Sequence, residues 1–200
     1  MNFIIVGLGN PGEEYQDTKH NAGRMVLEAL RKKLEFSDWE NRKEFTARYT
    51  AGNVGDNKIT LLEPETFMNL SGKSVVKCAG ENVVPENIIV VHDDLDLPIG
   101  KFRISFDRGN GGHKGVLSIE TLLKTRRFVR VRVGVSPVSF LGMMKKPKGA
   151  DVVEKFVLSK FGTSDTKKLL SVIEDCISAI EDVLKDGRDT AMGKWNGKSL

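Results

Sequence analysis

The chain has 200 residues, of which 29% are charged and 40% hydrophobic, and its formal net charge is +4. These values are typical of a soluble globular protein, and we expect one domain over residues 1–200. Cys78 and Cys176 are too few and too far apart for a disulfide framework or a thiolate zinc site. No run reaches the roughly 18 apolar residues of a membrane span, and the amino terminus lacks a signal-peptide pattern. We therefore expect a cytoplasmic protein without a membrane partner.

Continuous apolar runs rich in β-branched residues predict strands that are buried on both faces. In chain order we expect strands at residues 3–8, 45–51, 58–62, 88–91, 101–106 and 128–135, with a hairpin turn at 55–58. Amphipathic stretches predict helices at 21–34, 68–81 and 115–124, and a final helix that is capped by Thr163 or Ser164 and ended by Gly187. Alternating strands and helices indicate the α/β class, here an α/β/α sandwich with a mixed, mostly parallel sheet and helices on both faces.

The loop between the first strand and the first helix carries an amide, an aromatic ring and an imidazole, on Asn10, Tyr15 and His20. Loops at the carboxyl ends of strands are where ligands bind in open α/β sheets. A histidine in such a loop titrates near neutrality and can act as a general base. We interpret this segment as an active-site loop.

The same loop contains Gly7, Gly9 and Gly12, which fit the dinucleotide-binding pattern after a strand. A nicotinamide-dependent oxidoreductase would also need a second strand after the helix, but residues 35–44 are too polar for a central strand. Pro11 further removes an N–H from the loop that would hold a pyrophosphate. We favour the alternative that these glycines turn the chain tightly and let a substrate come close.

A run of carboxylates follows the strand expected at 88–91, at Asp93, Asp94 and Asp96. If that strand is a parallel neighbour of the first, His20 and Asp93 emerge at one edge of the sheet. A carboxylate bonded to one imidazole nitrogen fixes the tautomer and leaves the other nitrogen to take a proton from water. The same carboxylates could instead hold a divalent cation, or Asp94 and Asp96 could simply order the following loop.

Two further segments are candidates for ligand contacts. Asn69 can donate to and accept from a peptide-like group beside an apolar wall of Phe67 and Met68, although a capped helix start with Phe67 and Met68 in the core is an equal alternative. Basic residues gather in the second half of the chain, where Arg130 and Arg132 share one strand face. This group is either a solvated face or a binding surface for successive phosphates, and consists of Lys101, Arg103, Arg108, Lys124, Arg126, Arg127, Arg130 and Arg132.

Five ordered motifs together resemble the bacterial-type peptidyl-tRNA hydrolases. They are GLGNPG at 7–12 with Tyr15, TKHNAG at 18–23, TFMNLSG at 66–72, HDDLDLP at 92–98 and GGHKG at 111–115. They span most of the first 135 residues at close to the family's spacing. The resemblance implies hydrolysis of the ester between a peptide and the 3′-terminal ribose of tRNA, by a cytoplasmic monomer that uses no cofactor or metal and recycles tRNA during translation.

The resemblance also implies roles for individual residues. His20 would activate water, Asp93 would orient His20, and Asn10 would place the water or substrate. The terminal nucleotide or aminoacyl group would contact Tyr15 and Phe67, Asn69 would hold a carbonyl or amide, and Arg103 and Arg132 would bind tRNA phosphates. At the position of Lys114 the family commonly has asparagine, and we predict that Lys114 binds the substrate. The basic loop at 142–149 is expected to be mobile and to form part of a lid. A non-catalytic RNA-binding protein on the same scaffold is the alternative.

Overall fold

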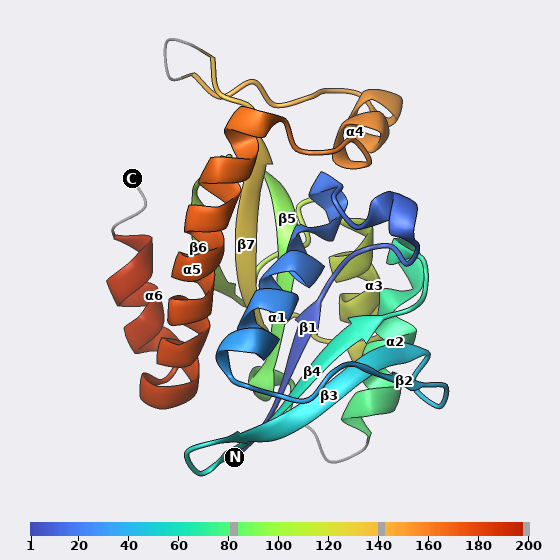
Figure 1. The fold of residues 1–200 in the computed structure, drawn as a ribbon, viewed down its shortest axis with the longest axis vertical. Coiled ribbons are helices and arrows are strands. Elements are labelled where there is room, and N and C mark those ends of the chain that lie inside the picture. The colour runs from blue at the N-terminus through green and yellow to red at the C-terminus, as the bar shows by residue number, and fades with distance from the viewer. Residues whose placement is uncertain (81–83, 140–142, 198–200) are drawn as a thin grey trace.

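A seven-stranded mixed sheet forms the centre of the molecule in this computed structural model, which describes residues 1–80, 84–139 and 143–197 (Figure 1). The four central strands β4, β1, β5 and β7 run parallel, while β2 and β3 at one edge and β6 at the other pair antiparallel. In spatial order the strands are β2 (Glu40–Arg42), β3 (Ala47–Val54), β4 (Asn57–Pro64), β1 (Asn2–Gly7), β5 (Ile88–Pro98), β7 (Val129–Ser136) and β6 (Phe102–Phe106).

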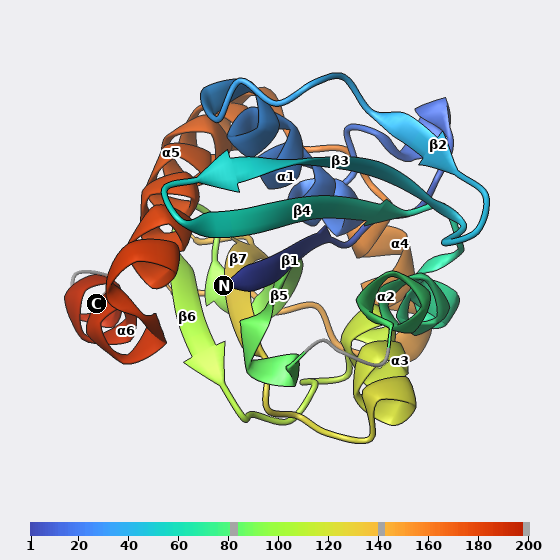
Figure 2. The same cartoon turned by 90° about the horizontal axis from the view of Figure 1, so that it is seen from below.

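Helices cover both faces of the sheet, as Figure 2 shows. Along β1, Ile5 belongs to a core with α1 and α5, whereas Ile4 and Val6 belong to a second core with α2 and α3. This alternation is the reason a continuous apolar strand can support two helix layers. The helices are α1 (Ala22–Lys33), α2 (Ser71–Ala79), α3 (Lys114–Leu123), α4 (Ala150–Val157), α5 (Thr163–Asp186) and α6 (Arg188–Asn196), with 3₁₀ turns η1 (Glu13–Tyr15), η2 (Lys19–Asn21), η3 (Met68–Leu70) and η4 (Pro85–Asn87).

The predicted α/β/α sandwich and the β3–β4 hairpin are confirmed, with Gly55 in the turn at φ 57°. The predicted end of the third parallel strand at residue 91 is wrong, because β5 continues to Pro98 through pairing with β7. The predicted cap of the last long helix is also wrong. Its N-cap residue is Gly162, and neither Thr163 nor Ser164 supplies a side-chain cap. Glu81, the expected end of the second helix, lies outside the described residues.

Two glycines bring α1 unusually close to the sheet. A Cβ on Gly23 would lie 2.3 Å from the Val91 carbonyl oxygen, and one on Gly7 would lie 2.8 Å from the Gly23 carbonyl oxygen. Gly7 therefore serves helix packing, which corrects our expectation that it admits a substrate. The close approach fixes the start of α1, and with it His20, above β5.

Neither cysteine of the chain forms a disulfide, since Cys78 and Cys176 are both free. The described helices include none that combines the length and apolar character needed to cross a bilayer.

Candidate active site

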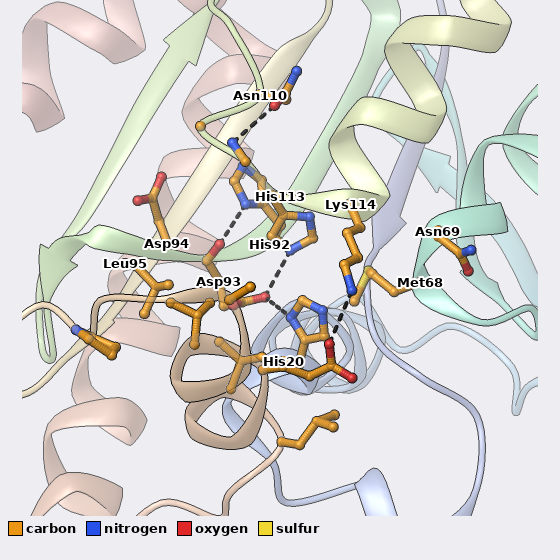
Figure 3. Close-up of a pocket in the computed structure, with 18 of the residues that line it drawn as sticks. His20, Met68, Asn69, His92, Asp93, Asp94, Leu95, Asn110, His113 and Lys114 are labelled. Carbon is orange, nitrogen blue, oxygen red and sulfur yellow. Dashed lines mark hydrogen bonds and ion pairs between the residues drawn. The ribbon is translucent and has the colours of Figure 1, made fainter.

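His20 and Asp93 meet at the carboxyl edge of the parallel strands, as the sequence predicts. His20 lies in η2 directly before α1, and Asp93 lies in β5, the parallel neighbour of β1. His20 Nδ1 is 2.8 Å from Asp93 Oδ1 (Figure 3). The Asp93 side chain is buried while the His20 ring keeps 13% of its surface exposed. The imidazole is therefore held from the protein side and open toward solvent on its other side.

The charge state of Asp93 fixes the direction of this hydrogen bond. Burial acts to raise the pKa of Asp93, but the electrostatic interactions and hydrogen bonds with His20 and His113 outweigh it and hold that pKa well below its usual range. An ionised carboxylate only accepts hydrogen bonds, so His20 Nδ1 donates. Burial likewise acts to lower the pKa of His20, yet the Asp93 carboxylate more than offsets this and raises it. His20 Nε2 is left as the basic nitrogen.

His113 is a site residue to which our sequence reasoning gave no role. Its Nε2 lies 2.9 Å from the same Asp93 Oδ1 atom that His20 contacts. Its Nδ1 accepts the backbone N–H groups of Gly115 and Val116, at 3.2 and 3.3 Å, and so caps the start of α3. The advance signals were its place in the GGHKG motif and immediately before a predicted helix. Asp93 is consequently anchored by imidazoles from two different elements.

Asn10 is buried and fixed in orientation by backbone contacts. Its Oδ1 accepts the Met68 N–H at 3.0 Å, while its own backbone N–H and C=O pair with the side-chain amide of Asn21, each at 2.9 Å. The reciprocal pair with Asn21 ties the β1 loop to the residue that follows His20. Because Met68 occupies the side-chain oxygen, the NH₂ group of Asn10 is the part of the amide left for a ligand.

A cavity of about 890 Å³ opens over the His20–Asp93 pair. Six of the nine residues selected from the sequence line it together, namely Asn10, His20, Phe67, Asn69, Asp93 and Lys114. Phe67 is 62% exposed, so the alternative that places it in the core is wrong, whereas Met68 does belong to the core. Tyr15, in η1, is not among the residues that line this cavity. The cavity is wide enough for a drug-sized group or larger.

The far wall of the cavity comes from α4, a helix that the sequence analysis did not predict. Figure 1 places α4 at the end of the molecule toward which β1 and β5 run. Val153 and Val157 supply apolar surface, and Glu154 Oε2 lies 3.3 Å from Lys114 Nζ on α3. This ion pair spans the cavity between α3 and α4. Residues 146–149 of the proposed lid loop also line it, whereas Gly142 lies outside the described residues.

The carboxylates of Asp94 and Asp96, which follow His92, are paired with basic side chains of the protein itself. Asp94 Oδ2 accepts from Arg132 Nε at 2.6 Å, and Asp94 Oδ1 accepts the Asp96 backbone N–H at 2.7 Å. Asp96 pairs with Lys146. The alternative that Asp94 and Asp96 order the chain therefore describes them better than a divalent cation site.

One other group of possible metal ligands occurs in the described residues, formed by His20, Asp93 and His113. To bind a metal, His113 Nε2 would have to lose its proton. That proton would move to Nδ1, where it would face the two N–H groups that Nδ1 now accepts. The donor set therefore does not fit a metal ion.

Arg130 and Arg132 do share a strand face, but both are buried, so the solvated-face alternative is wrong for them. Arg103 lies opposite Arg132 in the β6–β7 ladder and thus on the same face. Beside the large cavity is a second one of about 430 Å³, whose basic lining comes from Arg108, Arg130 and Arg132. Arg103 is not among its lining residues.

The sequence and the fold of the chain are both similar to those of known proteins. A sequence model described as "Peptidyl-tRNA hydrolase" matches residues 4–200. A peptidyl-tRNA hydrolase of Caldanaerobacter subterraneus is 40% identical over 196 residues, covering 98% of this chain and all of the relative. One of Syntrophotalea carbinolica is 36% identical, covering 98% and 97%. The crystal structure of the Acinetobacter baumannii peptidyl-tRNA hydrolase superposes with a TM-score of 0.87 at 32% identity, covering 97% of this chain and 94% of that one. The chain belongs to the peptidyl-tRNA hydrolase family.

Proposed function

We propose that this protein hydrolyses the ester bond between a peptide, or an N-blocked aminoacyl group, and the 3′-terminal ribose of tRNA. The observation that carries the proposal is the 2.8 Å contact of His20 Nδ1 with the ionised Asp93, at the floor of a cavity lined by Asn10 and Asn69. This set supplies a base, the group that orients it, and amides that match a peptide-like substrate.

In the proposed reaction His20 Nε2 takes a proton from a water molecule, whose oxygen attacks the ester carbonyl carbon. The resulting imidazolium is stabilised by Asp93 through Nδ1–H. As the tetrahedral intermediate collapses, the bond to the ribose 3′-oxygen breaks and that oxygen takes the proton from His20. The products are a peptide carboxylic acid, which releases its proton to water and becomes the carboxylate, and tRNA with a free 3′-hydroxyl group, and the base is regenerated.

Substrate contacts are assigned to the residues that line the cavity. The NH₂ group of Asn10 and the amide of Asn69 are placed to bind the carbonyl and amide groups of the peptide, which favours N-blocked substrates. The exposed ring of Phe67 offers a stacking surface for the terminal base or the aminoacyl side chain. The Lys114 ammonium can donate to a substrate carbonyl once it leaves Glu154. Tyr15 would contact the part of the substrate that extends beyond this cavity.

Phosphates of the tRNA are assigned to the basic second cavity. It adjoins the first, since both are lined by His92, Asp94 and Asn110. Arg132 lines this second cavity, although it is already paired with Asp94. Arg103 is on the same strand face. A substrate that fills both cavities would have its ester at His20 and a phosphate near Arg132.

The direct test uses one tRNA charged with an amino acid, half of it N-acetylated. We expect release of tRNA from the acetylated form, slow or no release from the free form, and unchanged rates in EDTA, because the ring tautomer of His113 opposes a metal. Equal rates on both forms would contradict the assignment of Asn10 and Asn69. No release from either would overturn the function, and loss of rate in EDTA would overturn the metal-free mechanism.

A further inference from the structure

Two imidazoles compete for one oxygen of the buried Asp93. His20 Nδ1 lies 2.8 Å and His113 Nε2 2.9 Å from Oδ1. We propose that His113 is a positioning residue that holds the Asp93 carboxylate and shares its charge, so that His20 binds a proton less strongly than it would beside Asp93 alone. This inference deepens the proposed function and rests on it.

The proton on His113 is fixed by the fold. Its Nδ1 accepts two backbone N–H groups at the start of α3, so the proton of the neutral ring sits on Nε2 and points at Asp93. The ring is 8% exposed, and its centroid lies 5.0 Å from that of His20. His113 thus joins the helix start to Asp93 as a donor of fixed direction.

Sharing of the carboxylate matters because a base must be neutral to work. Hydrogen bonds to the charged form of Asp93 spread its negative charge and weaken its attraction for the His20 imidazolium. The other charged groups that face His20 are Lys114 at the start of α3 and Glu154 on α4, which act in opposite directions. Neither Lys114 nor Glu154 is in contact with Asp93 Oδ1. His113 is therefore the group that, besides His20, spreads the negative charge of the Asp93 carboxylate.

Two substitutions separate the donor from the helix cap. In His113→Asn, the side-chain oxygen replaces Nδ1 and keeps a good cap, but the shorter amide does not reach Asp93. In His113→Gln, the amide nitrogen replaces Nε2 and keeps the donor, whereas the cap is weakened. We therefore expect the Tm of the Gln variant to fall by about 2–5 °C and that of the Asn variant to stay near wild type.

The readout is the acidic limb of the kcat/KM profile against pH, which reports the base of the free enzyme. In His113→Asn we expect this limb to move up by roughly half a pH unit to one unit, because Asp93 then serves His20 alone. In His113→Gln it stays where it is in the wild type. The proposal is overturned if the Asn variant does not shift, if both variants shift alike, or if the Gln variant alone shifts.

A measurement without substrate keeps this test independent of the proposed function. NMR titration follows the ring protons of His20, which is simple to assign because the chain has only three histidines and His92 is buried with a pKa held far below normal. The same upward shift is expected in His113→Asn. If the wild type cleaves no tRNA ester, the proposed function fails. The titration still decides whether His113 shares the charge of the Asp93 carboxylate with His20. An unshifted titration in an active enzyme overturns the role of His113 alone.

Discussion

Lys19 and Ser159 are 140 positions apart in the chain, yet Lys19 Nζ donates to Ser159 Oγ at 2.9 Å. The same ammonium donates to the carbonyl oxygens of Ser159 and Lys160, at 3.4 and 2.7 Å. Lys19 is buried and immediately precedes His20. The carboxyl end of α4, which forms one wall of the cavity, is therefore tied to the turn that carries the proposed base.

We expect Lys19→Met to lower the free energy of unfolding by about 1–3 kcal/mol, because it removes the hydrogen bonds that the buried Lys19 ammonium donates to Ser159 and Lys160. The loosened α4 should also raise KM more than it lowers kcat. Lys160→Met is the matched control, because the Lys160 side chain makes an exposed ion pair with Asp17 at 3.2 Å, worth about 0–1 kcal/mol, and the substitution keeps the backbone carbonyl that accepts from Lys19. Chemical denaturation and steady-state kinetics compare the two. Equal losses of stability in Lys19→Met and Lys160→Met would contradict the conclusion that Lys19 holds α4 against the turn that carries His20.

The pH profile tests the base itself. Because Asp93 raises the pKa of His20, the acidic limb of kcat/KM should lie above pH 6.5, the ordinary value, and activity should fall about tenfold per pH unit below it. Asp93→Asn removes the opposing charge, so burial should move the limb to lower pH while the maximal rate falls. A limb that stays in place in Asp93→Asn would show that another group titrates.

Removal of the base should lower kcat far more than any substitution around it. We expect His20→Ala to reduce kcat by about 10²–10⁴-fold, the usual contribution of general base catalysis. Asp93 keeps its hydrogen bond with His113 in this variant, so thermal unfolding should be affected less than activity. Rapid-quench measurement of tRNA release checks the rate. Retention of full activity would end the proposed mechanism.

The elements with a strong apolar pattern could be predicted from the sequence, and the parallel placement of β1 and β5 brought His20 to Asp93 as expected. Two helices were not predicted, for different reasons. In α6 the one fully buried position is Ala191, so no apolar stripe marks it, and contacts with α5 and β6 stabilise it instead. In α4 the apolar residues do recur at helical spacing, at Val152, Val153, Phe156 and Val157, and this short pattern was overlooked.

The site was predictable where chemistry and strand ends coincide, as with Asn10, His20 and Asp93. The site could not be predicted where the role of a residue depends on strand register or on long-range contacts. His113 reaches Asp93 only because the loop before α3 returns to β5, and Arg132 is buried only because β7 lies between β5 and β6. Local spacing carries no information on either distance.

Asn10 allows its two amide functions to be tested separately. Asn10→Ala leaves the buried Met68 N–H unpaired, so we expect a loss of stability of about 1–3 kcal/mol. Asn10→Asp keeps an acceptor for Met68 but replaces the NH₂ donor by a carboxylate oxygen and adds a negative charge at a buried position, so it tests the donor while the Met68 hydrogen bond is retained. If that donor binds substrate, both variants lose roughly tenfold in kcat/KM at the pH optimum. Full activity in Asn10→Asp would show that the NH₂ group contacts no substrate.

The Lys114–Glu154 pair should control the pH response of His20 without affecting folding. The two side chains are 66% and 60% exposed, so breaking their 3.3 Å contact should change stability by less than about 1 kcal/mol. Lys114 lowers the pKa of His20, and Glu154 raises it. Glu154→Gln should therefore move the acidic limb of kcat/KM to lower pH, and Lys114→Met should move it to higher pH.

The double variant Lys114→Met with Glu154→Gln completes this cycle. It removes both charges, so its acidic limb should return close to that of the wild type. Salt should reduce each single shift, because the charges act on His20 from exposed positions. If the acidic limb moved in the same direction in both single variants, the electrostatic account would be contradicted. Substitutions that acted only by disturbing the cavity would not be expected to move the limb in opposite directions. A rise in KM confined to the Lys114 variants would instead mark its ammonium as a substrate ligand.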